Sequence, residues 1–239
     1  MAYEQTYRLR TQDFDCNDQM HPATVLDLFQ DVAGWDVQSQ GFGTRELLER
    51  HGLLWVVIRS KYEVAAPPAP HALVTARTWT DAPTRLGFRR ESQLLDEAGA
   101  LLVKGTADWI MMDAETRSFA SVLDVWPDGG DGDARRNFEG KLKKLRPFEA
   151  QGEALRVVGG YSDLDANGHV NNTRYAAFTM DALDLEHGER VKSLQIDYRR
   201  ELRRGQAVDI SCRRDGCLAR AAGTTEDGGC AFSAAIELS

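Results

Sequence analysis

A dense group of polar side chains precedes a helical pattern in the second half of the sequence. Between positions 161 and 172 the chain reads YSDLDANGHVNN, which places Asp165, Asn167 and His169 at alternate positions. A second carboxylate, Glu201, follows a strand-like segment further along. A carboxylate or an imidazole within reach of a water molecule can act as a general base. The set could therefore activate water to attack a carbonyl group.

The start of the following helix could complete such a site. Free backbone N–H groups and the positive end of the helix dipole can hold the oxyanion that forms when a carbonyl is attacked. Val170, Asn171 and Asn172 stand at this start. One such donor can contribute roughly 3–4 kcal/mol to a transition state.

Two other interpretations of this segment compete with catalysis. The pattern DxDxNG from position 163 opens like a calcium loop, but that loop needs a bidentate glutamate where this sequence has Arg174. A cation at this position disfavours calcium, and we predict no metal site. The other interpretation is a turn with a helix cap, in which the Asp and Asn side chains bind backbone N–H groups and His169 only fills space.

A repeat within the chain favours the catalytic interpretation. The first half contains DCNDQMHP, in which Asp15 and Asn17 precede their counterparts by 150 positions. Gln19 stands where the second copy has His169. A cap would not call for a histidine in one copy only, whereas catalysis needs it in just one.

Both copies continue with the same series of elements. Apolar residues at three- and four-residue steps predict a helix from Val25 to Trp35, and a second helical pattern covers 175–185. Strand-like segments follow, with Gly- and Asp-containing turns at 96–99 and 226–229. An amphipathic helix must bury its apolar face, and its own sheet offers that surface. We therefore predict an α+β fold, a tandem (double) hotdog in which two antiparallel sheets each wrap a long central helix and join into one continuous sheet.

The repeat also sets the expected domain boundaries. We predict an N-terminal hotdog over 1–123, a linker over 124–151 and a C-terminal, catalytic hotdog over 152–239. The linker is rich in Gly, Asp, Lys and Arg, and its segment WPDGGDGD from Trp126 reads as exposed.

Composition argues against several classes of function. A net charge of −8 disfavours nucleic-acid binding. The four cysteines form no CxxC pair, so neither a zinc ribbon nor a redox motif is indicated, and we expect no cofactor. No apolar run approaches the roughly 18 residues of a membrane helix, and the N-terminus lacks a secretory signal. We expect a cytoplasmic protein without a membrane span, either a monomer or a homodimer.

Four motifs resemble one family, the plant and bacterial acyl-acyl carrier protein (ACP) thioesterases. YxDLDxNxHVNNxxY at 161–175 looks like the family signature, and IDYRRE at 196–201 is similar to its second block. LWVV with the following arginine at 54–59, and WxMMDxETR at 109–117, are weaker likenesses. The resemblance implies a double hotdog that hydrolyses long- or medium-chain fatty acyl-ACP, releasing free fatty acid and holo-ACP in fatty acid biosynthesis.

The resemblance also implies roles for individual residues. Asp165, Asn167, His169 and Glu201 match the family's catalytic positions. Plant members have a cysteine directly after that glutamate, where this chain has Leu202. A cysteine nucleophile is therefore not expected at this position, and direct attack by water is.

We expect the four matched residues to divide the chemistry. Glu201 acts as general base, and His169 shares or relays the proton. Asn167 positions the water or polarises the thioester carbonyl, and Asp165 holds Asn167 and the helix start in place.

The substrate's two ends need further surfaces. An apolar tunnel for the acyl chain is expected in the first copy, whose polar set is degenerate; the alternative for its candidate residues, Val25, Phe29, Trp35, Trp55 and Val57, is ordinary core. ACP is acidic, so a basic patch would aid its encounter. The candidates, which could equally form a plain solvated face, are Arg135, Arg136, Lys141, Lys143, Lys144 and Arg199.

Two alternative functions stay open at this point. An acyl-CoA thioesterase would use the same chemistry on another carrier. A non-catalytic acyl-binding hotdog module would not need Glu201, Asn167 and His169 together.

Overall fold

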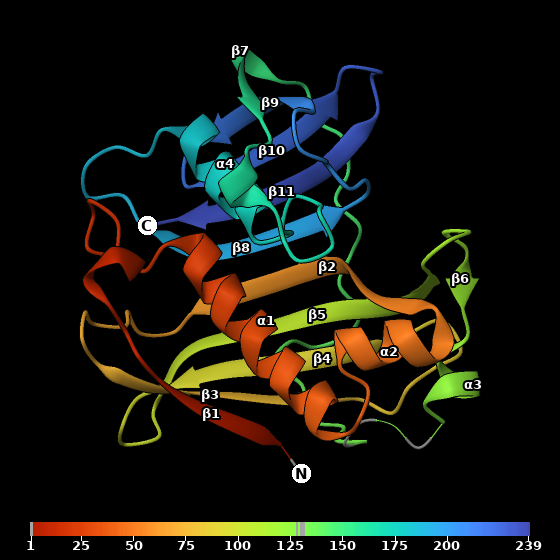
Figure 1. Ribbon diagram of the computed structural model, residues 1–239. Helices are drawn as coiled ribbons and strands as arrows, with labels where there is room; N and C mark the ends of the chain where they lie inside the picture. The colour runs from red at the N-terminus through yellow and green to blue at the C-terminus, as the bar shows by residue number, and fades with distance from the viewer. Residues whose placement is uncertain (1, 128, 130–131) are drawn as a thin grey trace. The chain divides into compact units, whose positions relative to one another are not determined.

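Antiparallel strands are the main secondary structure of the chain, and helices interrupt them at a few points (Figure 1). The computed structural model describes residues 2–127, 129 and 132–239. Two compact units form: residues up to Thr11 with Asp27–Lys141, and Gln12–Leu26 with Leu142–Ser239. The helix α1 (Pro22–Ser39) includes the predicted range from Val25 to Trp35 and begins at a proline, a residue that suits the first helical turn. It contributes residues to both units.

The first unit contains a sheet with the strand order β1-β3-β4-β5-β2, in which all neighbours are antiparallel. A short strand, β6, pairs with β5, and the helices α2 and α3 lie in the connections. The hairpin turn predicted at 96–99 joins β4 to β5, and Gly99 adopts the positive φ that such a turn requires. The bounds are β1 (Tyr3–Arg8), α2 (Thr44–His51), β2 (Leu53–Val64), β3 (Leu73–Thr80), β4 (Phe88–Leu95), β5 (Leu101–Asp113), β6 (Phe119–Ala120) and α3 (Val122–Val125).

From residue 27 onward, α1 packs against this sheet through apolar and charged contacts. The Phe29 ring lies so close to Gly105 of β5 that an added Cβ would stand 2.3 Å from it. Further along the helix, the Asp36 carboxylate forms an ion pair with Arg90 of β4 at 2.6 Å. Only 5% and 1% of these two side chains is exposed. The amphipathic helix predicted from the sequence therefore also carries a buried charge.

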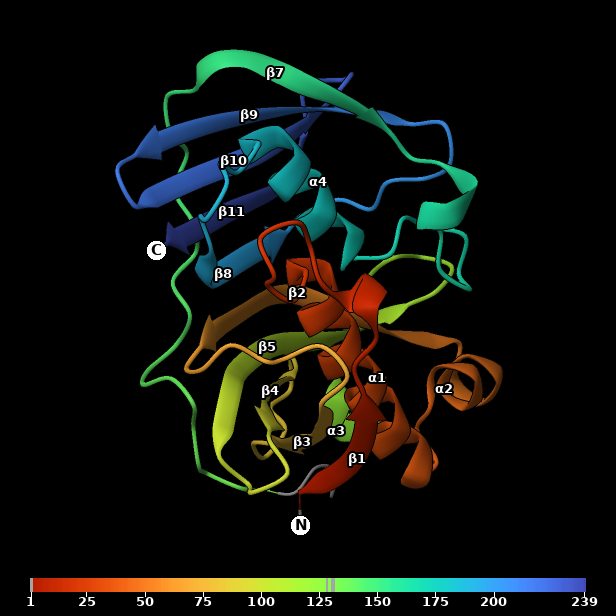
Figure 2. The ribbon, with the colours of Figure 1, turned by 90° about the vertical axis from the view of Figure 1, so that its left-hand side faces the viewer.

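The second unit contains a sheet with the strand order β8-β11-β10-β9-β7, again antiparallel throughout. The helix α4 (Arg174–Leu183) lies against strands of this sheet (Figure 2) and buries Ala176, Phe178 and Leu183. The turn predicted at 226–229 joins β10 to β11. The strand bounds are β7 (Gln151–Val158), β8 (Val191–Tyr198), β9 (Ala207–Asp215), β10 (Leu218–Thr225) and β11 (Cys230–Leu238).

The prediction of an exposed stretch beginning at Trp126 is wrong for that residue. Trp126 is 4% exposed, and its ring packs on Phe42, Trp55 and Phe88 with centroid distances of 5.5–5.6 Å. Burial of a large aromatic ring stabilises the fold, and this stabilisation exceeds the preference of the neighbouring Gly and Asp residues for solvent. Positions 128, 130 and 131 of the predicted stretch lie outside the described residues.

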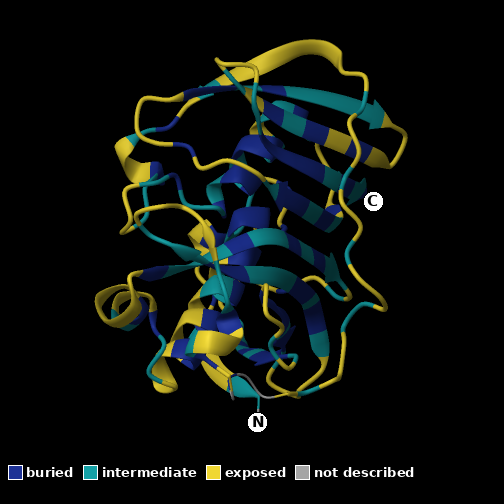
Figure 3. Ribbon diagram, turned by 90° about the vertical axis from the view of Figure 1, so that its right-hand side faces the viewer, coloured by how far each residue is buried: buried dark blue, intermediate teal, exposed yellow. Residues whose placement is uncertain are grey.

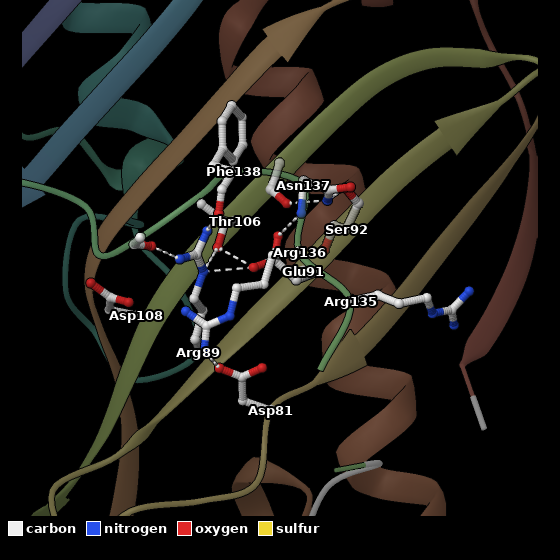
Figure 4. Close-up of polar contacts among 12 residues, drawn as sticks. Asp81, Arg89, Glu91, Ser92, Thr106, Asp108, Arg135, Arg136, Asn137 and Phe138 are labelled. Carbon is white, nitrogen blue, oxygen red and sulfur yellow. Dashed lines mark hydrogen bonds and ion pairs between the residues drawn. The ribbon is translucent and has the colours of Figure 1, made fainter. Parts of the chain in front are cut away.

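The later part of the connection is fixed to the first unit by a buried polar cluster. Most of residues 134–150 are exposed (Figure 3). Even so, Asn137 donates its backbone N–H to the Glu91 carboxylate at 3.1 Å, and its side-chain amide to Ser92 and Gly105 carbonyls (Figure 4). Glu91 forms an ion pair with Arg89 at 2.6 Å, and burial raises the pKa of its carboxyl. This segment is therefore held against β4 and β5.

Candidate active site

The polar segment of the second unit folds into a loop organised by Asp165. The loop begins with the short 3-10 helix η2 (Tyr161–Asp163). The Asp165 carboxylate accepts the backbone N–H of Asn167 at 2.8 Å and that of His169 at 3.2 Å. Its own N–H donates to the His169 carbonyl at 2.8 Å. These bonds fix the chain on which the imidazole is carried.

The first copy adopts the same loop, which confirms the repeat. It begins with η1 (Thr11–Asp13), and Asp15 accepts the backbone N–H of Asn17 and Gln19 at 2.8 and 3.2 Å. The isolated bridges Phe14–Met20 and Leu164–Val170 also match at an offset of 150 positions. Because both copies keep this aspartate and its bonds, its task is to shape the loop.

His169 and Glu201 meet across two segments that are distant in the sequence. The His169 Nε2 lies 3.4 Å from the Glu201 Oε2, and the side chains are 18% and 37% exposed. A backbone bridge joins His169 to Arg203, and the Val170 N–H donates to the Leu202 carbonyl at 2.7 Å. The carboxylate and the imidazole are thus within reach of each other and of water.

Of the other predicted site residues, Asn167 is exposed on the same loop. Two of the three N–H groups expected to bind the oxyanion already donate hydrogen bonds within the protein. The N–H groups of Val170 and Asn171 donate to the Leu202 and Asp163 carbonyls. Within the described residues, the N–H of Asn172 donates no hydrogen bond and is the remaining candidate. Sequence reasoning could not foresee this, because the bonds depend on how the loop closes.

Asp163 is a residue of this loop to which the sequence alone assigned no role. It is 8% exposed, its carboxylate accepts the Gly160 N–H at 2.8 Å, and it pairs with Arg174 at 2.9 Å. The internal repeat could have indicated this role, because Asp13 precedes Asp163 by 150 positions. In the structure Asp13 is also buried. The arginine that argued against calcium thus neutralises a loop carboxylate.

The polar residues of the first copy bind backbone instead of forming a second site. Asn17 accepts the Gly188 N–H at 2.9 Å and donates to the Glu186 carbonyl at 3.2 Å. Gln19 accepts the Val191 N–H at 2.7 Å. The degenerate copy therefore holds the segment that leads into β8.

Replacing Asn17 with alanine is expected to lower the free energy of unfolding by about 1–3 kcal/mol, because two backbone groups lose a partner at a buried position. Chemical denaturation would measure the change. The exposed counterpart Asn167 is the matched control, and Asn167→Ala is expected to change stability by less than about 0.5 kcal/mol. Equal stabilities for the two variants would contradict the structural assignment of Asn17.

The five residues proposed for acyl binding lie in different surroundings. Val25, Phe29 and Val57 are buried, and Trp55 packs on Phe88 and Trp126. Trp35 is 48% exposed, so the predicted apolar stripe does not bury it. An acyl-binding role for the set stays a prediction.

Of the six proposed carrier-binding residues, two are held by acids of their own unit. Arg135 pairs with Asp133 and Arg136 with Asp81 (Figure 4 shows the second contact). Lys141, Lys143 and Lys144 are exposed. In the second unit, Arg199 donates to the Leu145 carbonyl, which brings it beside the segment that carries Lys143 and Lys144.

Among the described residues, no helix combines the length and the apolar character that crossing a membrane requires.

Comparison with known proteins gives consistent results. The acyl-ACP thioesterase N-terminal domain model matches residues 1–126, and the corresponding C-terminal domain model matches residues 149–237. Oleoyl-acyl carrier protein thioesterase 2 of Arabidopsis thaliana is 30% identical over 226 residues, covering 87% of this chain and 62% of the relative. A Coriandrum sativum oleoyl-acyl carrier protein thioesterase is 28% identical with the same coverage. The chain thus spans about three-fifths of the length of these relatives.

Solved structures share the fold. An acyl-ACP thioesterase from Bacteroides thetaiotaomicron superposes with a TM-score of 0.88 at 20% identity, covering 100% of this chain and 98% of the other. A 12:0-ACP thioesterase from Umbellularia californica gives 0.84 at 23% identity, with coverage of 100% and 97%.

Proposed function

The chain belongs to the acyl-ACP thioesterase family, and we propose that it hydrolyses the thioester of fatty acyl-ACP, releasing free fatty acid and holo-ACP. The observation that carries this proposal is the 3.4 Å contact between the His169 Nε2 and the Glu201 Oε2. A paired carboxylate and imidazole, reachable by solvent, can activate water for attack on a carbonyl.

In the proposed reaction, Glu201 takes a proton from water as the water oxygen bonds to the thioester carbon. The negative charge moves to the carbonyl oxygen, to which, in this proposal, the Asn172 N–H donates a hydrogen bond. The C–S bond then breaks, and His169 relays the proton to the departing pantetheine thiolate. Asn167 orients the water, and Asp165 holds the loop.

Leu202 occupies the position at which plant members carry cysteine, and it is 1% exposed. Because no thiol is present there, the acyl group is not passed to the protein at this position. Direct attack by water follows as the proposed route.

For the fold, we propose that the two units are the halves of a double hotdog, with α1 and α4 as the central helices and the two sheets continuing into one another. The recurrence of the same loop at both helix starts supports this proposal. We also propose a cytoplasmic location and leave monomer and homodimer open, which sedimentation would decide.

The proposal is tested by incubating the purified chain with acyl-ACP and measuring free thiol. We expect steady release of one thiol per fatty acid, and faster turnover than on the acyl-CoA of the same chain length. Preference for acyl-CoA would indicate the other carrier. Binding without thiol release would indicate a non-catalytic acyl-binding module.

Carrier docking is proposed at Lys143, Lys144 and Arg199. Lys143→Glu with Lys144→Glu is expected to lower kcat/KM for acyl-ACP about tenfold at low salt and to leave kcat unchanged, because such charges act on the encounter. Steady-state kinetics over a salt series would measure it. A neutral acyl-N-acetylcysteamine thioester is the control, since it lacks the carrier. An equal fall in kcat/KM on both substrates would mean that the two lysines do not act by binding the carrier.

A further inference from the structure

The hydroxyl of Tyr175 lies between the two residues that flank Glu201. It donates to the Arg200 carbonyl at 3.2 Å and accepts the Leu202 N–H at 3.1 Å. Both backbone groups belong to the loop that follows β8. One side chain therefore bridges the loop immediately before and immediately after the proposed general base.

Tyr175 itself is firmly held. It lies in the first turn of α4 and is 3% exposed. Its ring packs edge-on against Phe232 of β11 and Tyr198 of β8, with centroid distances of 5.1 and 5.8 Å. Burial raises the pKa of its phenol, so the hydroxyl keeps the proton that it donates.

The loop residues that Tyr175 binds are also hydrogen-bonded to the segment that carries His169. Leu202, whose N–H binds Tyr175, accepts the Val170 N–H at 2.7 Å through its carbonyl. Val170 directly follows His169, whose backbone pairs with Arg203. The contacts run from the helix hydroxyl through Leu202 to the segment that carries the imidazole.

We propose that Tyr175 is a positioning residue that sets the separation of Glu201 and His169 through these two backbone bonds. The inference rests on the proposed function, since it assigns a task in the same reaction. A reacting group must be held to within a fraction of an ångström, and a misplacement of about 1 Å can cost about a hundredfold in rate. Loops hold side chains less precisely than helices, which is why a bridge from α4 matters here.

A purely structural role would satisfy two buried backbone groups and nothing more. Either role predicts a less stable protein when the hydroxyl is removed. Only positioning predicts a selective fall in kcat in protein that is still folded. The split between kcat and KM therefore separates the two roles.

The test is Tyr175→Phe, which keeps the ring and removes the hydroxyl. At a temperature where the variant is fully folded by circular dichroism, kcat on acyl-ACP is expected to fall about 10- to 100-fold with KM changed less than about threefold. Hydrogen exchange at the Leu202 amide is expected to accelerate at least about tenfold. The exchange measurement does not depend on turnover.

Thr179→Val is the matched control. Thr179 lies on the same helix, is fully buried and donates its hydroxyl to the Tyr175 carbonyl at 2.7 Å. Among the described residues it makes no hydrogen bond to the loop that carries Glu201. The kcat of the Thr179→Val variant is expected to stay within about twofold of wild type.

Wild-type kcat in Tyr175→Phe would overturn the inference, whether or not the Leu202 amide exchanges faster. If Tyr175→Phe does not fold, 4-aminophenylalanine at 175 keeps a donor and the ring while weakening the acceptor. Its kcat should fall about three- to tenfold, and an unchanged kcat would again overturn the inference. An inactive wild-type protein would instead refute the proposed function, and the inference with it.

Discussion

Replacing Glu201 with glutamine is expected to lower kcat for acyl-ACP hydrolysis at least about a hundredfold while the protein stays folded. Glutamine keeps the size of the side chain and one acceptor oxygen, but it cannot take a proton from water. The carboxylate lies 3.4 Å from the imidazole, and the glutamine side chain can occupy the same position without moving its neighbours. Thiol release under saturating acyl-ACP would measure kcat, and KM is expected to change little because the carboxylate acts on the water.

Glu237→Gln is the matched control for this prediction. Its side chain is 39% exposed against 37% for Glu201, and it pairs with Lys192 instead of a histidine. We expect wild-type kcat from this variant. Loss of activity in both would point to a general effect of charge.

His169→Ala is expected to produce a similar loss, and the double variant little more than either single one, because paired groups act as a unit. Additive losses would mean that the two side chains work in separate steps. Wild-type kcat in both single variants would remove the chemical basis of the proposed function.

The largest effect on stability is expected from Asp36→Ala, at about 3–5 kcal/mol in the free energy of unfolding. The change leaves the Arg90 guanidinium, 1% exposed, without the carboxylate that faces it at 2.6 Å. The Asp36 carboxylate also accepts a bond from Gln40 at 2.9 Å, which is lost as well. Urea denaturation of wild type and variant would give the difference.

An exposed ion pair is the control. Arg45 and Glu49 lie 2.8 Å apart on α2 with side chains 86% and 61% exposed, and Glu49→Ala is expected to cost no more than about 0.5 kcal/mol. Combining Asp36→Leu with Arg90→Met should recover most of the lost stability, since an apolar pair can replace a buried ionic one. A cost of Asp36→Ala near that of Glu49→Ala would show that water reaches the guanidinium.

Local patterns in the sequence predicted much of the fold, because they depend on neighbours along the chain. The helix over Val25 to Trp35 follows from the spacing of its apolar residues, and the turn at Gly99 follows from backbone preferences. The contact between His169 and Glu201 was predicted with help from the family resemblance, and the structure places the two side chains together.

Long-range partners could not be predicted in the same way. The residues around Asp36 in the sequence do not indicate that its partner is Arg90. In the same way, the residues around Trp126 do not indicate that its ring contacts Phe42. The engagement of the Val170 N–H with Leu202 depends on a loop more than thirty positions away. Such contacts follow from strand order, which residue types alone do not specify.

The bonds from Asn17 and Gln19 to the segment before β8 limit how members of this family can be recombined. A chimera joined near position 142 would take residues 12–26 from one parent and their binding segment, 186–191, from the other. Co-transferring both stretches should give better-expressed hybrids than a single crossover. A gene cut at that junction should likewise yield a C-terminal fragment that is poorly soluble when produced alone.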